Sequence, residues 1–263
     1  LCLYLTFSFS KIGLSPFNSK LIDKFEYLDH RGLSAVFLVA RAGIIYAIIE
    51  KFQHMLISAN PIHQQYLIYF ILIISVITCF YMGFLAIWSS DLNKAIGLVY
   101  ISQLSFMGIY LCYGPSFDIL ENLILMNITL HLALVLCAVP VLYLKNKDGS
   151  YKKGRWKLGG YSLIWGTLTL IGLPPSLGII AKITSLSSFI REGYLLESMA
   201  LITGLFLSVN LLSKIFKFNF DMKLLSNSGP ITAAPIRLKI FTMLLLLMTL
   251  VGLLFLKNIL QII

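Results

Sequence analysis

Long apolar segments constrain the fold of this chain more than any other feature of its sequence. A helix of about 20 mostly apolar residues crosses a bilayer core and pairs its own backbone groups there, which an isolated strand cannot do. Apolar segments of about that length or longer lie at 1–27, 33–57, 64–88, 95–113, 119–144, 158–190, 195–218 and 238–262. We therefore expect an all-α polytopic membrane protein with about eight transmembrane helices.

The composition agrees with a lipid environment. Hydrophobic residues make up 58% and charged residues 12% of the 263 residues, and the mean hydropathy is +0.87. A soluble domain has roughly 25% charged residues and needs them to cover its surface. The four cysteines are scattered through apolar segments with no CxxC or Cys/His ligand spacing. We therefore expect no metal site and no iron–sulfur cluster in this chain.

Basic residues fall almost entirely in one set of loops. If the segments alternate across the membrane, 14 Lys and Arg residues lie in the loops on one face and three on the other. The basic face receives the loops near 18–32, 89–94, 145–157 and 217–239. This bias predicts that the basic face is the matrix or cytoplasmic one. It also accounts for the net charge of +10 without a nucleic-acid partner, which would need an exposed basic patch with interleaved aromatics.

Proline interrupts two of the apolar segments. Pro16 interrupts the first, and Pro174 and Pro175 interrupt 158–190 within the stretch 172–178. Proline removes a backbone donor and clashes with the preceding turn, so each helix must kink or unwind there. Unwound backbone at membrane depth survives where it packs in protein or lines a wet cavity, as at the ion pathways of transporters. We expect two broken membrane helices; the alternative for 158–190 is a loop between two short helices.

A few ionisable residues lie inside the apolar segments. They are Lys11, Arg41 and Lys182, with His131 and Lys214 as weaker members. A basic residue at a helix centre costs about 2.5–3.5 kcal/mol to insert, so such residues normally face the protein interior and mark an ion route. The alternative is a side chain that reaches up to the membrane interface. We prefer that alternative for Lys214, because it lies near the end of its segment.

Lysine, arginine and histidine predict different chemistry at such positions. Burial disfavours the charged form of a lysine and a nearby carboxylate favours it, so a lysine can take up and release a proton as its surroundings change. Arg41 stays protonated in practically any protein setting and can only tune its neighbours. His131 can titrate near neutral pH, or it can be a structural, hydrogen-bonded residue.

Two motifs in the first half of the chain resemble the antiporter-like membrane subunits of respiratory complex I. The stretch 11–18, followed by Asp23 and Arg41, is similar to a family motif with a lysine before Pro-Phe and a second lysine eighteen residues after an aspartate. The stretch 91–106 is similar to a family motif that contains paired serines and a histidine.

A third motif resembles the helix break of the same family. Residues 172–175 read Gly-Leu-Pro-Pro and are followed by Gly178 and Lys182. A lysine at the end of this motif is typical of subunit 2 of the NADH dehydrogenase, whereas subunit 4 generally carries glutamate there. The whole resemblance covers about residues 8–220, and the order and spacing of the three motifs make it specific.

The resemblance implies a fold of two inverted five-helix repeats, each with one broken helix. Residues 1–57 would form the end of the first repeat, 58–220 the second repeat, and 221–263 a C-terminal transmembrane helix. The family's enzyme is a proton-translocating NADH:ubiquinone reductase. Its FMN, iron–sulfur clusters and ubiquinone would bind in partner subunits, so that this chain would hold no cofactor and no redox active site. The implied partners are other membrane-arm subunits, lipids and a separate N-terminal fragment that supplies the missing early helices.

The resemblance also implies a proton relay through buried lysines and water. The candidate relay residues are Lys11, Arg41, Lys94, Gln103, His131 and Lys182, and the candidate helix breaks are Pro16, Pro174 and Pro175. Four positions depart from the family pattern: Asn18 and Gln103 replace histidines, Lys20 replaces a tryptophan, and Arg41 replaces the second lysine. Gln103 can order water but cannot titrate, so the central relay would use water with Lys94 or His131 nearby. Lys94 could equally be a solvated residue near a helix start.

Three functions therefore stay open. The first is a proton-relaying subunit of complex I in the mitochondrial inner membrane, with a bacterial plasma membrane as the fallback. The second is a subunit of a multisubunit cation/proton antiporter, which would work without a redox partner. The third is a structural membrane-arm subunit with an inactive channel, which Arg41, Gln103 and Asn18 favour. The first residue is Leu1 rather than methionine, so we expect a cropped, processed or unusually initiated chain, and we see no cleavable signal peptide.

Overall fold

The computed structural model describes residues 61–111, 117–144, 157–191, 193–226 and 236–260, together with Lys51 and His54. Its helices are α4 (Pro61–Trp88), α5 (Leu92–Leu111), α6 (Phe117–Leu144), α7 (Lys157–Ile171), α8 (Leu177–Arg191), α9 (Leu195–Ser226) and α10 (Ile236–Leu260). The all-α prediction is confirmed for these residues. The predicted first broken helix, with Lys11, Pro16 and Arg41, lies outside them, so the count of about eight helices and the division into repeats stay predictions.

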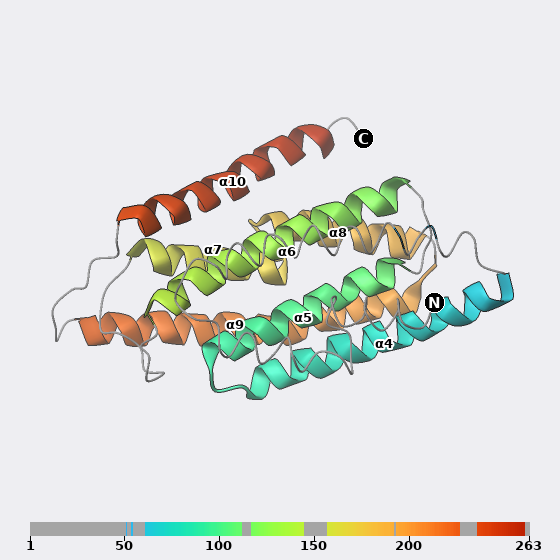
Figure 1. The fold of residues 1–263 in the computed structure, drawn as a ribbon, viewed down its shortest axis with the longest axis horizontal. Helices are drawn as coiled ribbons and strands as arrows, with labels where there is room; N and C mark the ends of the chain where they lie inside the picture. The colour runs from blue at the N-terminus through green and yellow to red at the C-terminus, as the bar shows by residue number, and fades with distance from the viewer. Residues whose placement is uncertain are drawn as a thin grey trace.

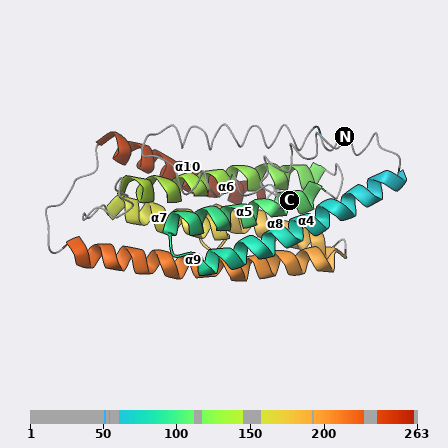
Figure 2. The ribbon, with the colours of Figure 1, turned by 60° about the horizontal axis from the view of Figure 1, so that its bottom comes forward.

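The described helices lie alongside one another and reverse direction at the ends of the molecule (Figures 1 and 2). α4 ends and α5 begins at one end of the molecule, where α6 is followed by α7 and α9 by α10 (Figure 1). These three connections are the ones that the distribution of basic residues placed on one face. The reversal of direction from helix to helix that this count assumed is therefore present in the described part of the chain.

α4 and α9 pack closely although they are far apart in the sequence. Small residues recur every fourth position on both helices: Ser75, Cys79 and Gly83 on α4, and Ala200, Gly204 and Ser208 on α9. A Cβ atom on Gly83 would lie 3.0 Å from the Leu207 Cβ atom, and one on Gly204 would lie 2.8 Å from the Cys79 Sγ atom. Such stripes let two membrane helices approach closely, which strengthens dispersion contacts where no hydrophobic driving force exists.

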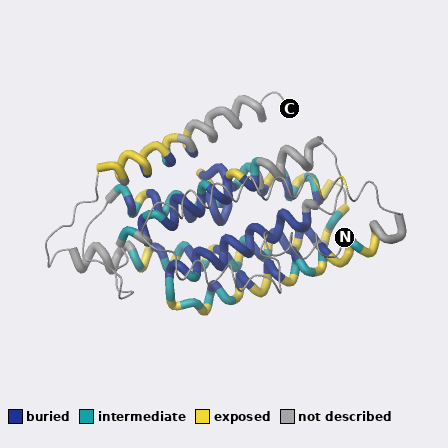
Figure 3. Tube along the Cα trace, in the orientation of Figure 1, coloured by how far each residue is buried: buried dark blue, intermediate teal, exposed yellow. Residues whose placement is uncertain are grey.

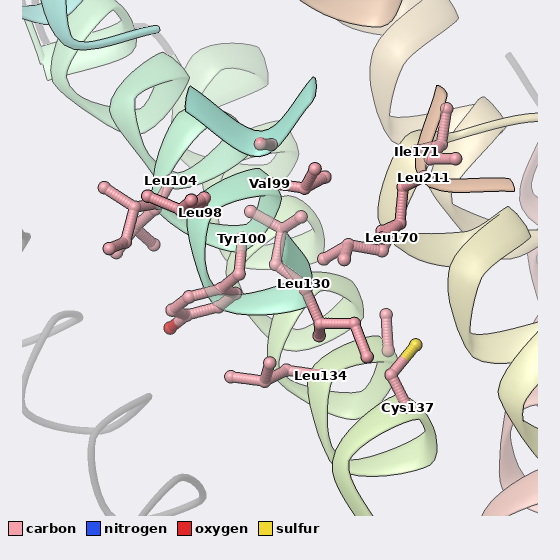
Figure 4. Close-up of a cluster of buried hydrophobic side chains, with 14 of the residues drawn as sticks. Leu98, Val99, Tyr100, Leu104, Leu130, Leu134, Cys137, Leu170, Ile171 and Leu211 are labelled. Atoms are coloured by element: carbon pink, nitrogen blue, oxygen red, sulfur yellow. The ribbon is translucent and has the colours of Figure 1, made fainter. Parts of the chain in front are cut away.

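α5 forms the centre of the bundle. It contacts α4, α6, α7 and α9, and its residues from Ala95 to Ile109 are buried (Figure 3). A helix that is buried on all sides must be apolar all round or must pair its polar groups. The apolar part of this core includes Leu98, Leu104, Leu130 and Leu170, which come together from α5, α6 and α7 (Figure 4). The polar part, described below, is where the candidate site lies.

The outward faces of the bundle are apolar. Trp88 on α4 and Phe206 on α9 are 79% and 75% exposed. α10 is mostly exposed along its first half (Figure 3), and Ile240 and Met243 are among its exposed apolar residues. Among the described residues, the stretches Gln65–Trp88 and Glu197–Phe218 are long and apolar enough to cross a membrane, and Leu125–Val141 and Leu158–Ile171 are shorter apolar helices. An outer surface of this kind suits lipid or partner subunits and not water.

One helix end differs from the sequence-based expectation. The sequence places a loop near 217–239, but α9 continues as a helix to Ser226. A hydropathy profile identifies only the part of a helix that is apolar enough to lie in the membrane core. Residues such as Lys223, Leu224 and Leu225 favour a helix on either side of the membrane boundary.

Candidate functional site

A helix break lies at Pro174 and Pro175, where the sequence predicts one. α7 ends at Ile171 and α8 begins at Leu177, and the two short helices continue in the same direction along the bundle (Figure 1). Gly172 adopts a φ of 81°, a left-handed conformation that favours glycine and commonly ends a helix. The Pro174–Pro175 peptide bond is cis, and both prolines are exposed on the described surface. The break therefore forms one interrupted helix.

Every helix leaves its last four carbonyl groups without intrahelical partners, and residues that follow α7 in the chain approach all four of them here. The Leu168 oxygen accepts from the Gly172 and Leu173 amides at 2.8 and 2.9 Å and from the Ser176 hydroxyl at 3.0 Å. The Thr169 oxygen faces the Cα atom of Gly178, where a side chain would collide with it. The carbonyl oxygens of Leu170 and Ile171 are left, and these two receive the Lys182 ammonium group.

Lys182 lies on α8 and reaches back to the end of α7. Its side chain is only 3% exposed. The Nζ atom donates to the Gln103 Oε1 atom, to the Ile171 carbonyl oxygen and, at 3.4 Å, to the Leu170 carbonyl oxygen. An ammonium group has three hydrogens to donate, so each has an acceptor here. The C-terminal end of α7 also carries partial negative charge, which favours a cation at this place.

Gln103 connects this lysine to the centre of the bundle. The Gln103 side chain is fully buried on α5, and its Nε2 atom lies 3.5 Å from the Gly204 carbonyl oxygen of α9. Because the amide nitrogen faces that carbonyl, the amide oxygen is directed at Lys182. α5, α7, α8 and α9 thus meet at one buried polar cluster, which we call the Lys182 cluster: Lys182, Gln103, Leu170, Ile171 and Gly204. The sequence singled out Lys182 and Gln103 separately, and the structure brings them together.

The cysteine of α4 lies next to the Lys182 cluster. The Cys79 thiol is fully buried and lies 3.6 Å from the Ser102 hydroxyl, and a Cβ atom on Gly204 would lie 2.8 Å from its Sγ atom. From the sequence, Cys79 is only one of four cysteines scattered through apolar segments. Its spacing of four from Ser75 and Gly83 is the signal that could have placed it on a helix–helix contact.

His131 belongs to a second buried polar pair. Its Nε2 atom lies 2.8 Å from the Tyr100 hydroxyl, and its Nδ1 atom lies 2.8 Å from the Asn127 carbonyl oxygen. A carbonyl can only accept, so Nδ1 carries a hydrogen, and in the neutral ring Nε2 accepts from the Tyr100 hydroxyl. The Tyr100 hydroxyl points away from Leu170 and Ile171 (Figure 4). The structure therefore keeps His131 apart from the end of α7.

The remaining basic candidates lie near the ends of helices. Lys94 is half-buried in the first turn of α5, roughly 13 Å along that helix from Gln103 at about 1.5 Å per residue, so the structure does not bring the two together. Lys214 on α9 is half-buried and donates to the Ala86 carbonyl oxygen at 2.7 Å and to the Ser89 carbonyl oxygen. Lys214 thus caps the end of α4 much as Lys182 caps the end of α7, but close to the surface.

Comparison with known proteins supports the fold. No protein-family model and no curated protein matches this sequence. Among solved structures, the chain is similar to a chain of the membrane-bound sulfane sulfur reductase, an archaeal respiratory membrane complex. The two share a TM-score of 0.81 and 15% sequence identity, over 96% of this chain and 52% of the other. The chain therefore has the fold of a subunit of that complex, and it spans about half of that subunit's length.

Proposed function

We propose that this chain is a membrane-arm subunit of a respiratory complex related to complex I, and that it relays protons through Lys182. The fold supports the first part, because the similar chain belongs to a respiratory membrane complex. The apolar outer surface and the two long apolar helices support a place in the membrane. The proposal also includes the resemblance to subunit 2 of the NADH dehydrogenase and a place in the mitochondrial inner membrane.

One observation carries the proton relay: a deeply buried lysine lies at a break in a helix, with uncharged oxygens as its hydrogen-bond partners. A buried ammonium group at this place points to a functional role and not to a stabilising one, because removing a charge from water has a high free-energy cost. A lysine can also give up its proton and persist as a neutral amine when its partners move. The helix break supplies such partners, because the carbonyl groups of Leu170 and Ile171 lie where the helix is interrupted and not inside a continuous helix.

The redox chemistry belongs to other subunits in this proposal. FMN, iron–sulfur clusters and ubiquinone would be bound by partners, and this chain would contribute proton movement. The chain's own residues would hold a proton at the Lys182 Nζ atom, order the site through Gln103 and exclude lipid through the packing of α4 against α9.

The test uses the whole assembly, purified through a tag on this chain and reconstituted into liposomes. We expect flavin and iron–sulfur subunits to co-purify, and we expect Lys182→Ala to leave assembly and electron transfer intact while it lowers the number of protons moved per electron. An unchanged proton-to-electron ratio in Lys182→Ala would refute the relay. Cation/proton exchange by an assembly without flavin or iron–sulfur subunits would favour the antiporter instead.

A second candidate function is a structural subunit whose channel is inactive. The direct bond between Lys182 and Gln103 favours it, because glutamine cannot pass a proton on by titrating. Gln103→His would restore a titratable group at this position. A rise in the proton-to-electron ratio of that variant above the wild-type value would support the structural role for the natural chain.

A further inference from the structure

The aliphatic part of Lys182 crosses the helix break directly over Gly172. A Cβ atom on Gly172 would lie 2.5 Å from the Lys182 Cδ atom and 3.0 Å from its Cε atom. It would also lie 3.1 Å from the Gly178 carbonyl oxygen. Carbon atoms in contact are normally about 3.5–4.0 Å apart, so no side chain fits between Gly172 and the lysine. The bare Cα atom of Gly172 is thus the surface on which the lysine lies.

We propose that Gly172 is a positioning residue for Lys182: the missing side chain at this turn opens the path by which the lysine reaches the last carbonyl groups of α7. The path is short, because the lysine starts on α8 and must fold back across the break to meet Leu170 and Ile171. A methyl group at Gly172 would push the lysine stem outward. The ammonium group would then lose at least one of its three oxygen partners.

The turn conformation alone does not explain why the space next to the Gly172 Cα atom must be empty. Gly193, in the turn between α8 and α9, has nearly the same positive φ as Gly172, 80° against 81°. No atom lies within 4 Å of a Cβ atom placed on Gly193. Alanine therefore has to adopt the same unfavourable positive φ at both positions, and it meets the lysine only at Gly172. Gly193→Ala is accordingly a matched control for the conformational part of the effect.

The consequence for proton movement rests on the proposed function, but the geometry can be tested without it. Lys182→Ala removes the Cδ and Cε atoms that a Gly172 side chain would meet. The two substitutions should therefore be coupled in the way expected for residues in contact. Gly172→Ala should lower the unfolding midpoint of the purified assembly more than Gly193→Ala does. In the Lys182→Ala background most of the difference between the two glycine variants should disappear. What remains should come from the strain of the turn and from the contact of the new Cβ atom at position 172 with the Gly178 carbonyl oxygen.

Equal effects of Gly172→Ala in the two backgrounds would overturn the proposal, since they would show that the glycine serves the turn alone. If Gly172→Ala fails to assemble by itself, the double variant decides the question: assembly restored by Lys182→Ala supports the positioning role, and continued failure contradicts it. Neither outcome depends on whether the lysine carries protons.

A functional measurement then separates this inference from the proposed function. The proton-to-electron ratio is followed against pH for the wild type, Gly172→Ala, Gly193→Ala and Lys182→Ala. A loss in Lys182→Ala with a displaced pH profile in Gly172→Ala, and a wild-type profile in Gly193→Ala, supports both proposals. A loss in Lys182→Ala with a wild-type profile in Gly172→Ala contradicts only the positioning role. A wild-type ratio in Lys182→Ala contradicts the relay and leaves the coupling experiment to decide the geometry.

Discussion

The Nζ atom of Lys182 and the Oε1 atom of Gln103 join α8 to α5 at the centre of the bundle, from positions 79 residues apart in the chain. Neither residue is accessible from outside the bundle. The pair combines a group that can exchange a proton with one that can only hold it in place. Under the proposed function, substitutions in this pair should therefore change proton movement, and two of the predictions test this directly.

A comparison of Lys182→Ala with Lys214→Ala should distinguish an effect on proton movement from an effect on stability. Each lysine donates to two carbonyl oxygens at the end of another helix, but Lys182 is buried and Lys214 is half-exposed. Lys214→Ala should lower stability by about 0.5–1.5 kcal/mol, the usual net value of a hydrogen bond, and leave the proton-to-electron ratio unchanged. Lys182→Ala should lower the ratio. Equal ratios in the two variants would argue against a special role for the buried lysine.

Substitution of Gln103 should change how firmly Lys182 holds its proton. Gln103→Glu keeps the shape of the side chain and places a carboxylate next to the ammonium group, which favours the charged lysine. Proton release should therefore slow, and turnover of the reconstituted assembly should fall while its subunit composition is unchanged. Gln103→Leu removes the acceptor and should lower stability by about 1–3 kcal/mol, since a donor of the buried lysine loses its partner. A Gln103→Glu assembly with wild-type turnover would contradict this reasoning.

Removal of the Tyr100 hydroxyl should destabilise the pair with His131. Tyr100→Phe leaves the Nε2 atom of a buried histidine without the donor that now lies 2.8 Å away. The expected loss is about 1–3 kcal/mol in the free energy of unfolding, measured by thermal unfolding in detergent. Tyr161→Phe is the control, because that side chain is 67% exposed. Similar unfolding midpoints for the two variants would show that the Tyr100–His131 bond adds no stability.

A side chain at Gly204 should separate α9 from its neighbours. A Cβ atom there would lie 2.7 Å from the Phe106 Cζ atom and 2.8 Å from the Cys79 Sγ atom. Overpacking of this kind costs about 1–3 kcal/mol. Gly204→Ala should lower the unfolding midpoint, and adding Cys79→Ala should recover part of the loss because it removes one of the two clashing atoms. If the second substitution lowers the midpoint further by its full single-variant effect, the two residues are not in contact as described.

The helices could be predicted from the sequence because hydropathy alone marks a membrane-crossing segment. The expected segment 64–88 became Pro61–Trp88, and 158–190 divided at the predicted prolines into α7 and α8. The close pairing of α4 with α9 could not be predicted in the same way. It depends on small residues such as Gly83 and Gly204, which a hydropathy profile counts as ordinary members of an apolar segment.

The charged residue of the candidate site could be predicted from the sequence, but the groups that surround it could not. Lys182 was conspicuous because a charge in an apolar helix is rare. Its partners were not, because two of them are backbone carbonyls whose availability depends on the hydrogen bonds of Leu168 and on the close approach of Gly178. Tyr100 was missed for a similar reason, since an aromatic residue in a membrane helix gives no sign in the sequence that its hydroxyl group meets a histidine.

The interruption of the α7–α8 helix has an electrical consequence. The two halves are 15 residues each, so a proton held on Lys182 lies near the middle of the span that they form together. Moving one elementary charge across a membrane is worth about 2.3 kcal/mol per 100 mV, so a charge that goes halfway experiences roughly half of this. In an energised membrane, the equilibrium constant for protonating Lys182 from one side would then differ about sevenfold per 100 mV from its value at zero voltage. The same lysine would be filled more easily from one face of the membrane than from the other, with no change in any of its contacts.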